Sequence, residues 1–295
     1  MLGSGEILVG IVTYNRREKL VRALDECRRL GFPNIVVFDN GCTDGTRAIL
    51  QDRTDISFFF TDQNEGCSSG FSRILRYFVQ ESECNWLLIF DDDAYPAFKC
   101  ESLAEYLRRD SAEKKPGYAL RVVYPDGVPC PMNRPGTDIL SNMPLRHLWK
   151  DFHLANDSRS CPVDFASFSG LLLHRDTVCR VGTVSPTFHI YSDDTYYTLS
   201  ISRNVGRLFY CSEFTLIHDC KRSSRNLADV DSVRIEKEVM NKIILIREYS
   251  RFKLLYISIY LARLLILNPS ISGKILRASG KGMSADLALY RNEAV

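Results

Sequence analysis

The chain has 295 residues, of which 45% are hydrophobic and 25% are charged, as in ordinary globular proteins. This length holds either one large α/β domain with an appendage or two domains. The net charge of +2 is unevenly distributed, because residues 220–295 carry 14 Lys and Arg against 7 Asp and Glu, whereas residues 1–219 carry 24 against 29. The basic C-terminal region favours an anionic partner, such as a membrane surface or a phosphorylated acceptor, and we expect no nucleic-acid partner.

Zinc sites and transmembrane helices are not expected. None of the ten cysteines belongs to a CxxC pair, the usual spacing of zinc ligands. The longest charge-free apolar run of the C-terminal region, residues 254–262, is too short to cross a bilayer. The N-terminus lacks a signal-peptide pattern, so a reducing cytoplasm is the expected compartment.

The first 110 residues alternate between strand and helix patterns. A continuous β-branched run at 7–13 predicts a strand buried on both faces. Apolar residues at helical spacing between Leu20 and Leu30 predict an amphipathic helix. Further strands are predicted at 34–38, 56–60 and 86–90, and further helices at 46–51 and 72–80. This alternation predicts an α/β fold with a mostly parallel central sheet flanked by helices.

The rest of the chain has weaker patterns. Strands are predicted at 118–124, 165–173 and 207–217, and a helix at 194–204, whereas 133–160 has little periodicity and is interpreted as a mobile lid. From residue 230 onward the pattern is helical. We therefore predict one large α/β domain at 1–220, with halves at about 1–110 and 111–220, followed by a helical, basic region at 221–295.

Polar residues follow each of the first four predicted strands, at 13–16, 39–41, 64–66 and 91–93. Ligands of such sheets bind beyond the carboxyl ends of the strands. The segment 39–46 alone is typical of a turn, but at this rim it also suits a nucleotide-binding loop. Four strand ends are therefore expected to form one binding site.

Three consecutive carboxylates, Asp91, Asp92 and Asp93, end the apolar strand 86–90. They could cap the following helix or pair with Arg or Lys, but three adjacent like charges fit that interpretation poorly. Carboxylate oxygens suit Mg²⁺ or Mn²⁺, and alternate residues at a strand end can direct Asp91 and Asp93 to one ion. A divalent metal site is the favoured hypothesis.

The segments VTYNR (12–16), FDNGCTDGT (38–46), NEGCSSGFSR (64–73) and IFDDDAYP (89–96) resemble the family-2 glycosyltransferases with a GT-A fold. The likeness covers about residues 7–220 and is strongest to bacterial galactofuranosyl- and rhamnosyltransferases that build surface polysaccharides. It implies an inverting, metal-dependent hexosyltransferase that uses a nucleotide sugar. The best donor hypothesis is UDP-galactofuranose, with dTDP-rhamnose as the alternative.

The resemblance also assigns the donor site. Thr13 and Asp39 match positions that hold the nucleoside, Arg73 a position near the diphosphate, and Asp92 a position against the ribose or sugar. With the other rim residues, the predicted donor-binding set is Thr13, Tyr14, Asn15, Arg16, Asp39, Asn40, Asn64, Gly66, Arg73, Asp91 and Asp92. Cys42 stands where Ser is commoner in the family, and Cys67, Ser68 and Ser69 replace a more glycine-rich stretch.

The pair Asp193 and Asp194 is typical of a helix N-terminus, where carboxylates are favoured. The resemblance adds that the second Asp of such a pair is the catalytic base, so the predicted catalytic residues are Asp194 and Asp193. Acceptor contacts are implied for Ser169, Gly170 and Tyr196, although the family commonly has an acidic residue at the position of Tyr196.

His218 follows an apolar strand, where a lone histidine is usually structural. In the galactofuranosyltransferase-like enzymes a His at about this interval completes the metal site, which implies a ligand set of Asp91, Asp93 and His218 for Mn²⁺ or Mg²⁺. Its neighbour Asp219 is predicted to orient the imidazole.

Two other functions remain open at this point. A sugar nucleotidyltransferase also uses an α/β sheet and metal-binding Asp, but 10–18 lacks the usual glycine-rich loop. A nucleotide-sugar-binding protein without turnover is the non-enzymatic alternative. The expected acceptor of the transferase is a growing bacterial surface glycan, such as an O-antigen, or a lipid-linked oligosaccharide.

The helical C-terminal region admits two interpretations. Residues 243–267 mix apolar and basic side chains, so a helix there either packs its apolar side on the catalytic domain or lies on an anionic membrane surface. In the second case the protein contacts the inner face of the cytoplasmic membrane peripherally.

Overall fold

The computed structural model describes residues 4–110, 115–137, 159–222 and 231–295. Its strands are β1 (Ile7–Thr13), β2 (Asn34–Asn40), β3 (Ser57–Thr61), β4 (Trp86–Asp91), β5 (Ala94–Pro96), β6 (Gly117–Val123), β7 (Cys161–Val163), β8 (Leu171–His174) and β9 (Leu208–His218). Its α-helices are α1 (Arg17–Arg29), α2 (Thr46–Asp52), α3 (Cys67–Gln80), α4 (Cys100–Arg109), α5 (Arg175–Val181), α6 (Asp193–Asn204), α7 (Ser232–Tyr249), α8 (Lys253–Leu267) and α9 (Ser272–Ser284). Short 3₁₀ helices lie at Ser4–Glu6, Pro131–Asn133, Pro186–Phe188, Pro269–Ile271 and Leu287–Tyr290.

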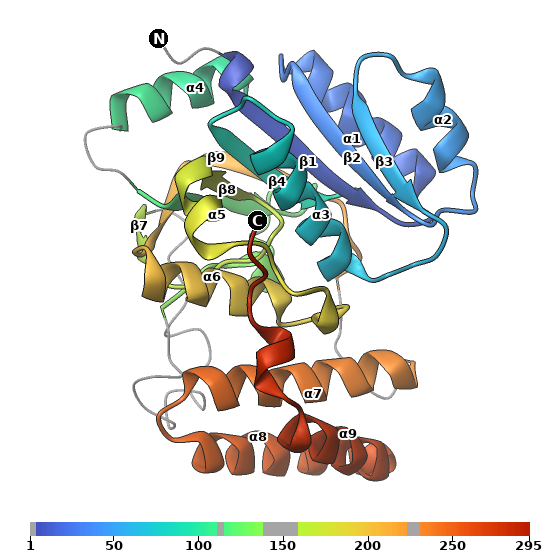
Figure 1. Ribbon diagram of the computed structural model, residues 1–295, viewed down its shortest axis with the longest axis vertical. Helices are drawn as coiled ribbons and strands as arrows, with labels where there is room; N and C mark the ends of the chain where they lie inside the picture. Colours follow the sequence, from blue (N-terminus) through green and yellow to red (C-terminus); the bar gives the residue numbers. More distant parts are fainter. Residues whose placement is uncertain (1–3, 111–114, 138–158, 223–230) are drawn as a thin grey trace.

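One mixed sheet forms the centre of the described chain, with the strand order β3-β2-β1-β4-β8-β6-β9-β5 and with β7 paired to β9 (Figure 1). Strands β3, β2, β1 and β4 pair in parallel, as the strand–helix alternation predicts. β8 is antiparallel to both β4 and β6, and β5 and β7 are antiparallel to β9. The predicted α/β class is confirmed, and the sheet is parallel in its N-terminal half and mixed beyond it.

Helices cover both faces of the sheet. Successive side chains of a strand point to opposite faces, and β1 is apolar at successive positions, so both of its faces must be covered. Ile7, Val9 and Ile11 pack in one core cluster with side chains of α1, α2 and α4. Leu8 and Val12 pack in a second cluster, with side chains of α3, α5 and α6. The strand is therefore buried on both sides, which explains its continuous apolar run.

Prediction and structure differ mainly in the second half of the chain. The predicted strand at 165–173 is shorter in the structure, where β8 begins at Leu171 after Gly170 in a left-handed conformation (φ 90°). The three-residue strands β5 and β7 and the seven-residue helix α5 were not predicted. Residues 138–158, which include most of the predicted lid, lie outside the described residues.

The C-terminal helices form a layer beside the sheet domain, with α7 next to that domain and α8 and α9 beyond it (Figure 1). Ile243, Ile244 and Leu245 of α7 are fully buried in the same core cluster as α3 and α6. The core-packing interpretation is therefore confirmed for α7. The division of the chain at residue 220 stays a prediction.

Helix α8 differs from α7, because the apolar residues near both of its ends are exposed, whereas Tyr256 and Ile257 are buried. The exposed fractions reach 71% for Leu254 and 77% for Ile266. Among the described helices, none alone has both the length and the apolar character of a membrane span. Helix α8 and the segment Pro269–Ser284 meet these criteria only together, with a bend of 109° between them.

Candidate active site

The carboxyl ends of the parallel strands meet at a cavity of about 790 Å³. Predicted rim residues line it together, namely Tyr14, Arg16, Asn40, Asn64, Gly66, Asp91, Asp92 and Asp93. The acceptor and catalytic predictions Ser169, Asp193, Asp194 and His218 line the same cavity. The structure therefore brings these predicted residues together at one cavity, although they come from both halves of the chain.

Asp92 is almost fully buried and is held by the end of β1. Its Oδ2 accepts hydrogen bonds from the Thr13 hydroxyl (2.8 Å) and the Tyr14 backbone N–H (3.2 Å), and its Oδ1 from Arg16 (3.0 Å). Burial raises the pKa of Asp92 to about 6, although Arg16 and Thr13 oppose the shift. The charge of Asp92 is therefore compensated by an ion pair with Arg16, an interpretation that the sequence disfavoured for the three carboxylates together.

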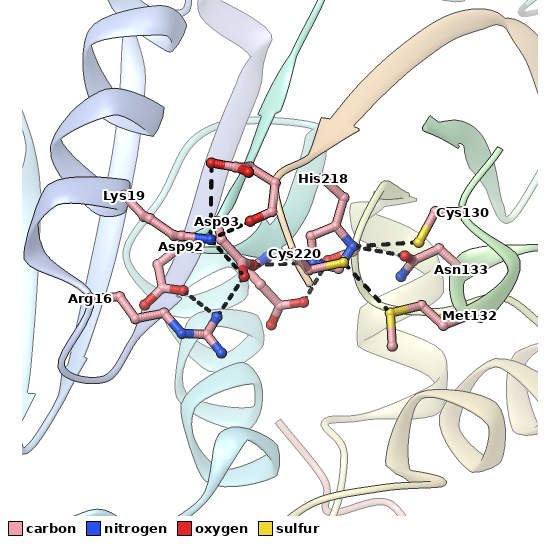
Figure 2. A network of polar contacts seen from close by, with 12 residues as sticks. Arg16, Lys19, Asp92, Asp93, Cys130, Met132, Asn133, His218 and Cys220 are labelled. Carbon is pink, nitrogen blue, oxygen red and sulfur yellow. Dashed lines mark hydrogen bonds and ion pairs between the residues drawn. The ribbon is translucent and has the colours of Figure 1, made fainter. Parts of the chain in front are cut away.

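Asp93 pairs with His218 across the sheet (Figure 2). The His218 Nε2 lies 3.1 Å from Asp93 Oδ1, and Arg16 lies 2.8 Å from Asp93 Oδ2. Ala94 of β5 is paired with His218 of β9, which explains why these distant positions meet. Burial raises the pKa of Asp93, but His218 and Arg16 together lower it below its ordinary value.

The imidazole of His218 is oriented by Asn133, which the sequence did not single out. The Nδ1 of His218 lies 2.8 Å from Asn133 Oδ1, and the Asn133 amide donates to the Ser167 hydroxyl (2.8 Å). The prediction that Asp219 orients the ring is wrong, because the Asp219 carboxylate pairs with Lys19 (3.9 Å) and Arg22 (3.5 Å) instead. Burial alone would lower the pKa of His218, but its hydrogen bond to Asp93 raises it to about 10.

Asp91, Asp93 and His218 each offer a ligand atom, and these atoms lie within 4.8 Å of one another. The Ser169 hydroxyl donates to Asp91 Oδ2 at 2.5 Å and holds that carboxylate in place. Two carboxylates and one imidazole are a suitable donor set for Mn²⁺ or Mg²⁺. The residues therefore fit the metal that the sequence predicts.

Asp193 and Asp194 open helix α6 but have different surroundings. Asp193 is buried, and its Oδ2 accepts from the Ser68 hydroxyl at 2.7 Å. Asp194 is half-buried, and the backbone N–H and hydroxyl of Thr195 both donate to its Oδ1. Burial and then the charge of Asp193 raise the pKa of Asp194 to about 7. Asp194 is thus suited to exchange a proton near neutral pH, whereas Asp193 is anchored to α3.

The loop before this pair is strained and is held from two sides. His189, Tyr191 and Ser192 have positive φ values of 64°, 68° and 63°, which are costly for residues with side chains. A Cβ on Gly66 would lie 2.3 Å from the His189 carbonyl oxygen, so only glycine permits this close approach of α3.

Helix α7 supplies the second support of the loop. The fully buried Asn241 side chain donates to the carbonyls of Phe188 (2.9 Å), Ile190 (2.8 Å) and Tyr191 (3.1 Å). No local pattern in the sequence indicates this role of Asn241, because its partners lie about 50 residues earlier in the chain. The C-terminal helices therefore help to position Asp193 and Asp194.

Several residues of the predicted donor-binding set form hydrogen bonds within and between the loops around the cavity. Buried Asp39 accepts from the Cys42 backbone N–H (2.7 Å) and from Arg47 (3.2 Å), and it shapes the turn after β2. Asn15 Oδ1 accepts from the Thr43 backbone N–H (2.7 Å). These bonds join the ends of β1 and β2.

The next strand end is joined in the same way. Asn40 donates to Asn64 Oδ1 (3.1 Å) and to the Gly66 carbonyl (3.1 Å). Arg73 pairs with Glu65 at 2.8 Å, on the exposed side of α3.

Two residues that were predicted to contact the acceptor substrate, Gly170 and Tyr196, instead form contacts within the fold. The Gly170 backbone N–H donates to Ile89 (3.0 Å), and its carbonyl accepts from Leu120 (2.8 Å), so Gly170 connects neighbouring strands. Tyr196 is 2% exposed, and its ring packs against Phe188 and Tyr249 at 5.0 Å each. The structure corrects the assignment of Tyr196, which faces the core rather than the cavity.

Residues of α7 and α8 form a further wall that the sequence did not predict. They are Asp231, which precedes α7, Val233, Arg234, Glu238 and Lys242 of α7, and Tyr260 of α8. The wall carries both signs of charge and an aromatic ring. A polar ligand extending away from the strand ends would contact it.

Comparisons with known proteins agree with this geometry. Residues 8–113 match the family model described as Glycosyl transferase family 2. No curated protein matches the sequence. The family match extends from β1 to α4 and covers about a third of the chain.

Solved glycosyltransferases share the fold at low sequence identity. S. aureus TarS 1–349 is 14% identical with a TM-score of 0.56, covering 94% of this chain and 80% of that chain, and it is also known with UDP-GlcNAc. GalNAc-T7 with UDP, GalNAc and Mn²⁺ is 13% identical with a TM-score of 0.59, covering 96% of this chain and 55% of that chain. The mannosyltransferase PcManGT from Pyrobaculum calidifontis, with GDP-Man and Mn²⁺, is 16% identical with a TM-score of 0.53, covering 96% and 77%.

The role of Asn241 can be tested by Asn241→Leu, which keeps the size of the side chain but removes its amide donor. Three carbonyls in the buried or half-buried loop then lose a hydrogen-bond donor, so we expect the free energy of unfolding to fall by about 2–4 kcal/mol in urea denaturation. Asn268→Leu is the matched control, because Asn268 donates to Leu264 at the half-exposed end of α8 (3.1 Å). It should cost less than about 1 kcal/mol. Equal losses in the two variants would contradict the proposed support.

Proposed function

We propose that this chain, a family-2 glycosyltransferase with a GT-A fold, transfers a sugar from a nucleoside diphosphate sugar to an acceptor hydroxyl with inversion. One observation carries the proposal: Asp91, Asp93 and His218 line the same cavity as Asp194. Asp91, Asp93 and His218 suit a metal-bound diphosphate, and Asp194 suits the role of proton acceptor. An inverting transfer needs both, held in a fixed relation to the two substrates.

The donor diphosphate is proposed to bind at the ends of β1 and β4. A Mn²⁺ or Mg²⁺ ion held by Asp91, Asp93 and His218 would neutralise the charge that develops on the leaving nucleoside diphosphate. Arg16 contributes a half-exposed guanidinium beside the same carboxylates. Asp92 fixes the end of β1 through Thr13 and Tyr14, so its role is to hold the rim in shape.

Asp194 is the proposed catalytic base. It takes the proton of the acceptor hydroxyl while the hydroxyl oxygen attacks the anomeric carbon and the bond to the diphosphate breaks. Both hydrogen bonds from Thr195 end on Oδ1, which leaves Oδ2 for the acceptor among the described contacts. Asp193 is already engaged by Ser68 and is proposed to position α6.

The donor is proposed to be a UDP-sugar, with UDP-galactofuranose first and dTDP-rhamnose as the alternative. Two of the similar structures contain a uridine diphosphate group, TarS with UDP-GlcNAc and GalNAc-T7 with UDP, whereas PcManGT contains GDP-Man. The choice of galactofuranose rests on the sequence resemblance and on His218, which stands at the interval typical of those enzymes.

The acceptor is proposed to be a bacterial surface glycan or a lipid-linked oligosaccharide, reached at the inner face of the cytoplasmic membrane. Helix α8 supports this proposal, because it carries Tyr260 at the cavity wall and exposed Leu254 and Ile266 on its outer side. Exposed Arg251, Lys253 and Arg263 accompany these apolar residues. An apolar face with basic neighbours is complementary to an anionic bilayer surface.

Metal binding is tested with Asp91→Ala and Asp93→Ala. Removing either carboxylate takes away a ligand, so UDP should no longer bind more tightly when Mn²⁺ is added, as measured by titration calorimetry. Asp62→Ala is the control, since Asp62 is an exposed partner of Arg47 away from the cavity. Unchanged Mn²⁺-dependent binding in both site variants, or full activity after EDTA treatment, would exclude the metal site.

The assignment of the base is tested with Asp194→Asn, which keeps the shape of the side chain but cannot accept the proton. Turnover, measured as release of nucleoside diphosphate, should fall by about 10²–10⁴-fold, with donor affinity nearly unchanged. Asp193→Asn should lower thermal stability and have the smaller effect on turnover. The opposite order would assign the base to Asp193.

The pH dependence of the wild-type enzyme provides an independent check. A carboxyl group with a pKa of about 7 is protonated below that value and cannot accept a proton, so turnover should rise as the pH increases through about 7. A profile that is flat between pH 5 and 8 would contradict a base with this pKa.

Membrane contact is tested by flotation with vesicles that do or do not contain anionic lipid. Point variants are needed, because truncating the tail would remove Ile243 and Ile244 from the core. Leu254→Glu combined with Ile266→Glu should reduce binding more than tenfold, since burying each side chain contributes about 1.5–3 kcal/mol. Val128→Glu, at another exposed apolar residue, is the control. Wild-type protein that does not float with anionic vesicles would exclude the proposal.

A further inference from the structure

A group of sulfur atoms lies on the side of His218 that faces away from Asp93 (Figure 2). Cys130, His218 and Cys220 each offer a ligand atom, and these atoms lie within 4.8 Å of one another. The Cys130 Sγ is 4.0 Å from His218 Nδ1, and the Cys220 Sγ is 3.9 Å from the Met132 Sδ. Cys130 and His218 are buried and Cys220 is half-buried, so the group is enclosed but accessible from the cavity.

The fold brings these residues together although Cys130 and Cys220 are 90 positions apart. Strands β6 and β9 pair in parallel, with Val123 opposite Ile217. Cys130 returns to β6 after a turn, where its backbone N–H donates to the Val122 carbonyl (3.0 Å). Cys220 follows the end of β9 by two residues. Sequence spacing alone therefore could not indicate this site.

The donor atoms of this group suit a thiophilic ion rather than Mg²⁺. Zn²⁺ binds thiolate sulfur at about 2.3 Å and imidazole nitrogen at about 2.0–2.1 Å, which places neighbouring tetrahedral ligand atoms about 3.5–3.8 Å apart. Ligand atoms that are now at most 4.8 Å apart would therefore have to approach one another by at most about 1.3 Å. The half-buried Cys220 side chain lies at the end of β9, where such a movement is unhindered by the strand ladder.

We propose that Cys130, Cys220 and the Nδ1 of His218 form a regulatory site for a thiophilic metal ion such as Zn²⁺. Binding displaces the two thiol protons and the proton that Nδ1 shares with Asn133. His218 then carries its remaining proton on Nε2, where it donates to Asp93 at the observed 3.1 Å. A carboxylate partner of this kind is the usual second contact of a metal-bound histidine.

The consequence is competition for one imidazole. The ligand set proposed for the catalytic metal needs the Nε2 lone pair of His218, whereas the thiophilic site leaves a proton on that nitrogen. The two occupied states therefore require opposite tautomers, and a thiophilic ion weakens Mn²⁺ binding at Asp91 and Asp93. This regulatory part rests on the proposed function, whereas the thiophilic site itself does not.

The site is tested by titrating Cd²⁺ alone into the reduced full-length chain and recording the ultraviolet cadmium–thiolate charge-transfer band. We expect saturation at one equivalent in the wild type and loss of the band in Cys130→Ser and in Cys220→Ser. Cys161→Ser is the matched control, because Cys161 is also half-buried but lies on β7, and it should keep the band. No band in the wild type, or a band that persists in both site variants, would overturn the site.

Competition is measured separately as Mn²⁺ binding by calorimetry with and without one equivalent of Zn²⁺. Zn²⁺ should weaken Mn²⁺ binding at least tenfold in the wild type and not in Cys220→Ser. A normal cadmium band without any effect on Mn²⁺ binding would overturn the regulatory part alone. A normal band in a protein that never binds Mn²⁺ would overturn the proposed catalytic metal site while the thiophilic site stands.

Discussion

The burial of two carboxylates, Asp92 and Asp93, next to the half-buried Asp91 at the end of β4 is the constraint on which the site depends. Asp92 and Asp93 are only 3% and 5% exposed, and buried charges are unfavourable unless they are paired and hydrogen-bonded. Arg16 before α1 and His218 at the end of β9 supply the compensation. These ion pairs therefore connect segments that are about 200 residues apart in the sequence.

This compensation also bears on ligand binding. Arg16 contacts both Asp92 and Asp93 through one nitrogen, and its side chain is half exposed. In the proposed reaction Asp91 and Asp93 would hold a cation that supplies part of that neutralisation, and the Arg16 guanidinium would then be available to the anionic donor. Arginine is well suited to this exchange, because its planar group binds carboxylate and phosphate in similar geometry. Arg16 thus stabilises the buried carboxylates, and in the proposed reaction the same guanidinium would orient the donor.

The parallel half of the fold could be predicted because β1, β2 and β4 are buried on both faces and appear as continuous apolar runs. The strand ends then predicted the cavity, including Asp91, Asp93 and Asn40. Asn133 and Asn241 could not be found in this way, because each acts on a partner about 50 or more residues distant and belongs to no local pattern. The short strands β5 and β7 have three residues each, which is too few for a periodic signal.

Tyr196 shows how helix geometry limits a motif-based prediction. Successive α-helical residues are rotated by about 100°, so a residue two places after Asp194 points about 200° away from it. Asp194 faces the cavity, and Tyr196 consequently faces the core, where its backbone carbonyl accepts from the Tyr249 hydroxyl (3.0 Å).

Helix α7 therefore meets α6 through Tyr196 and the preceding loop through Asn241. Both contacts fix the orientation of the first turn of α6, which carries Asp194. The strained loop before that turn could not keep its positive φ values without such support. The C-terminal helices are thus a structural requirement for the placement of Asp194. Because α8 belongs to the same helix layer as α7, a ligand or surface that contacts α8 would contact the layer that supports Asp194.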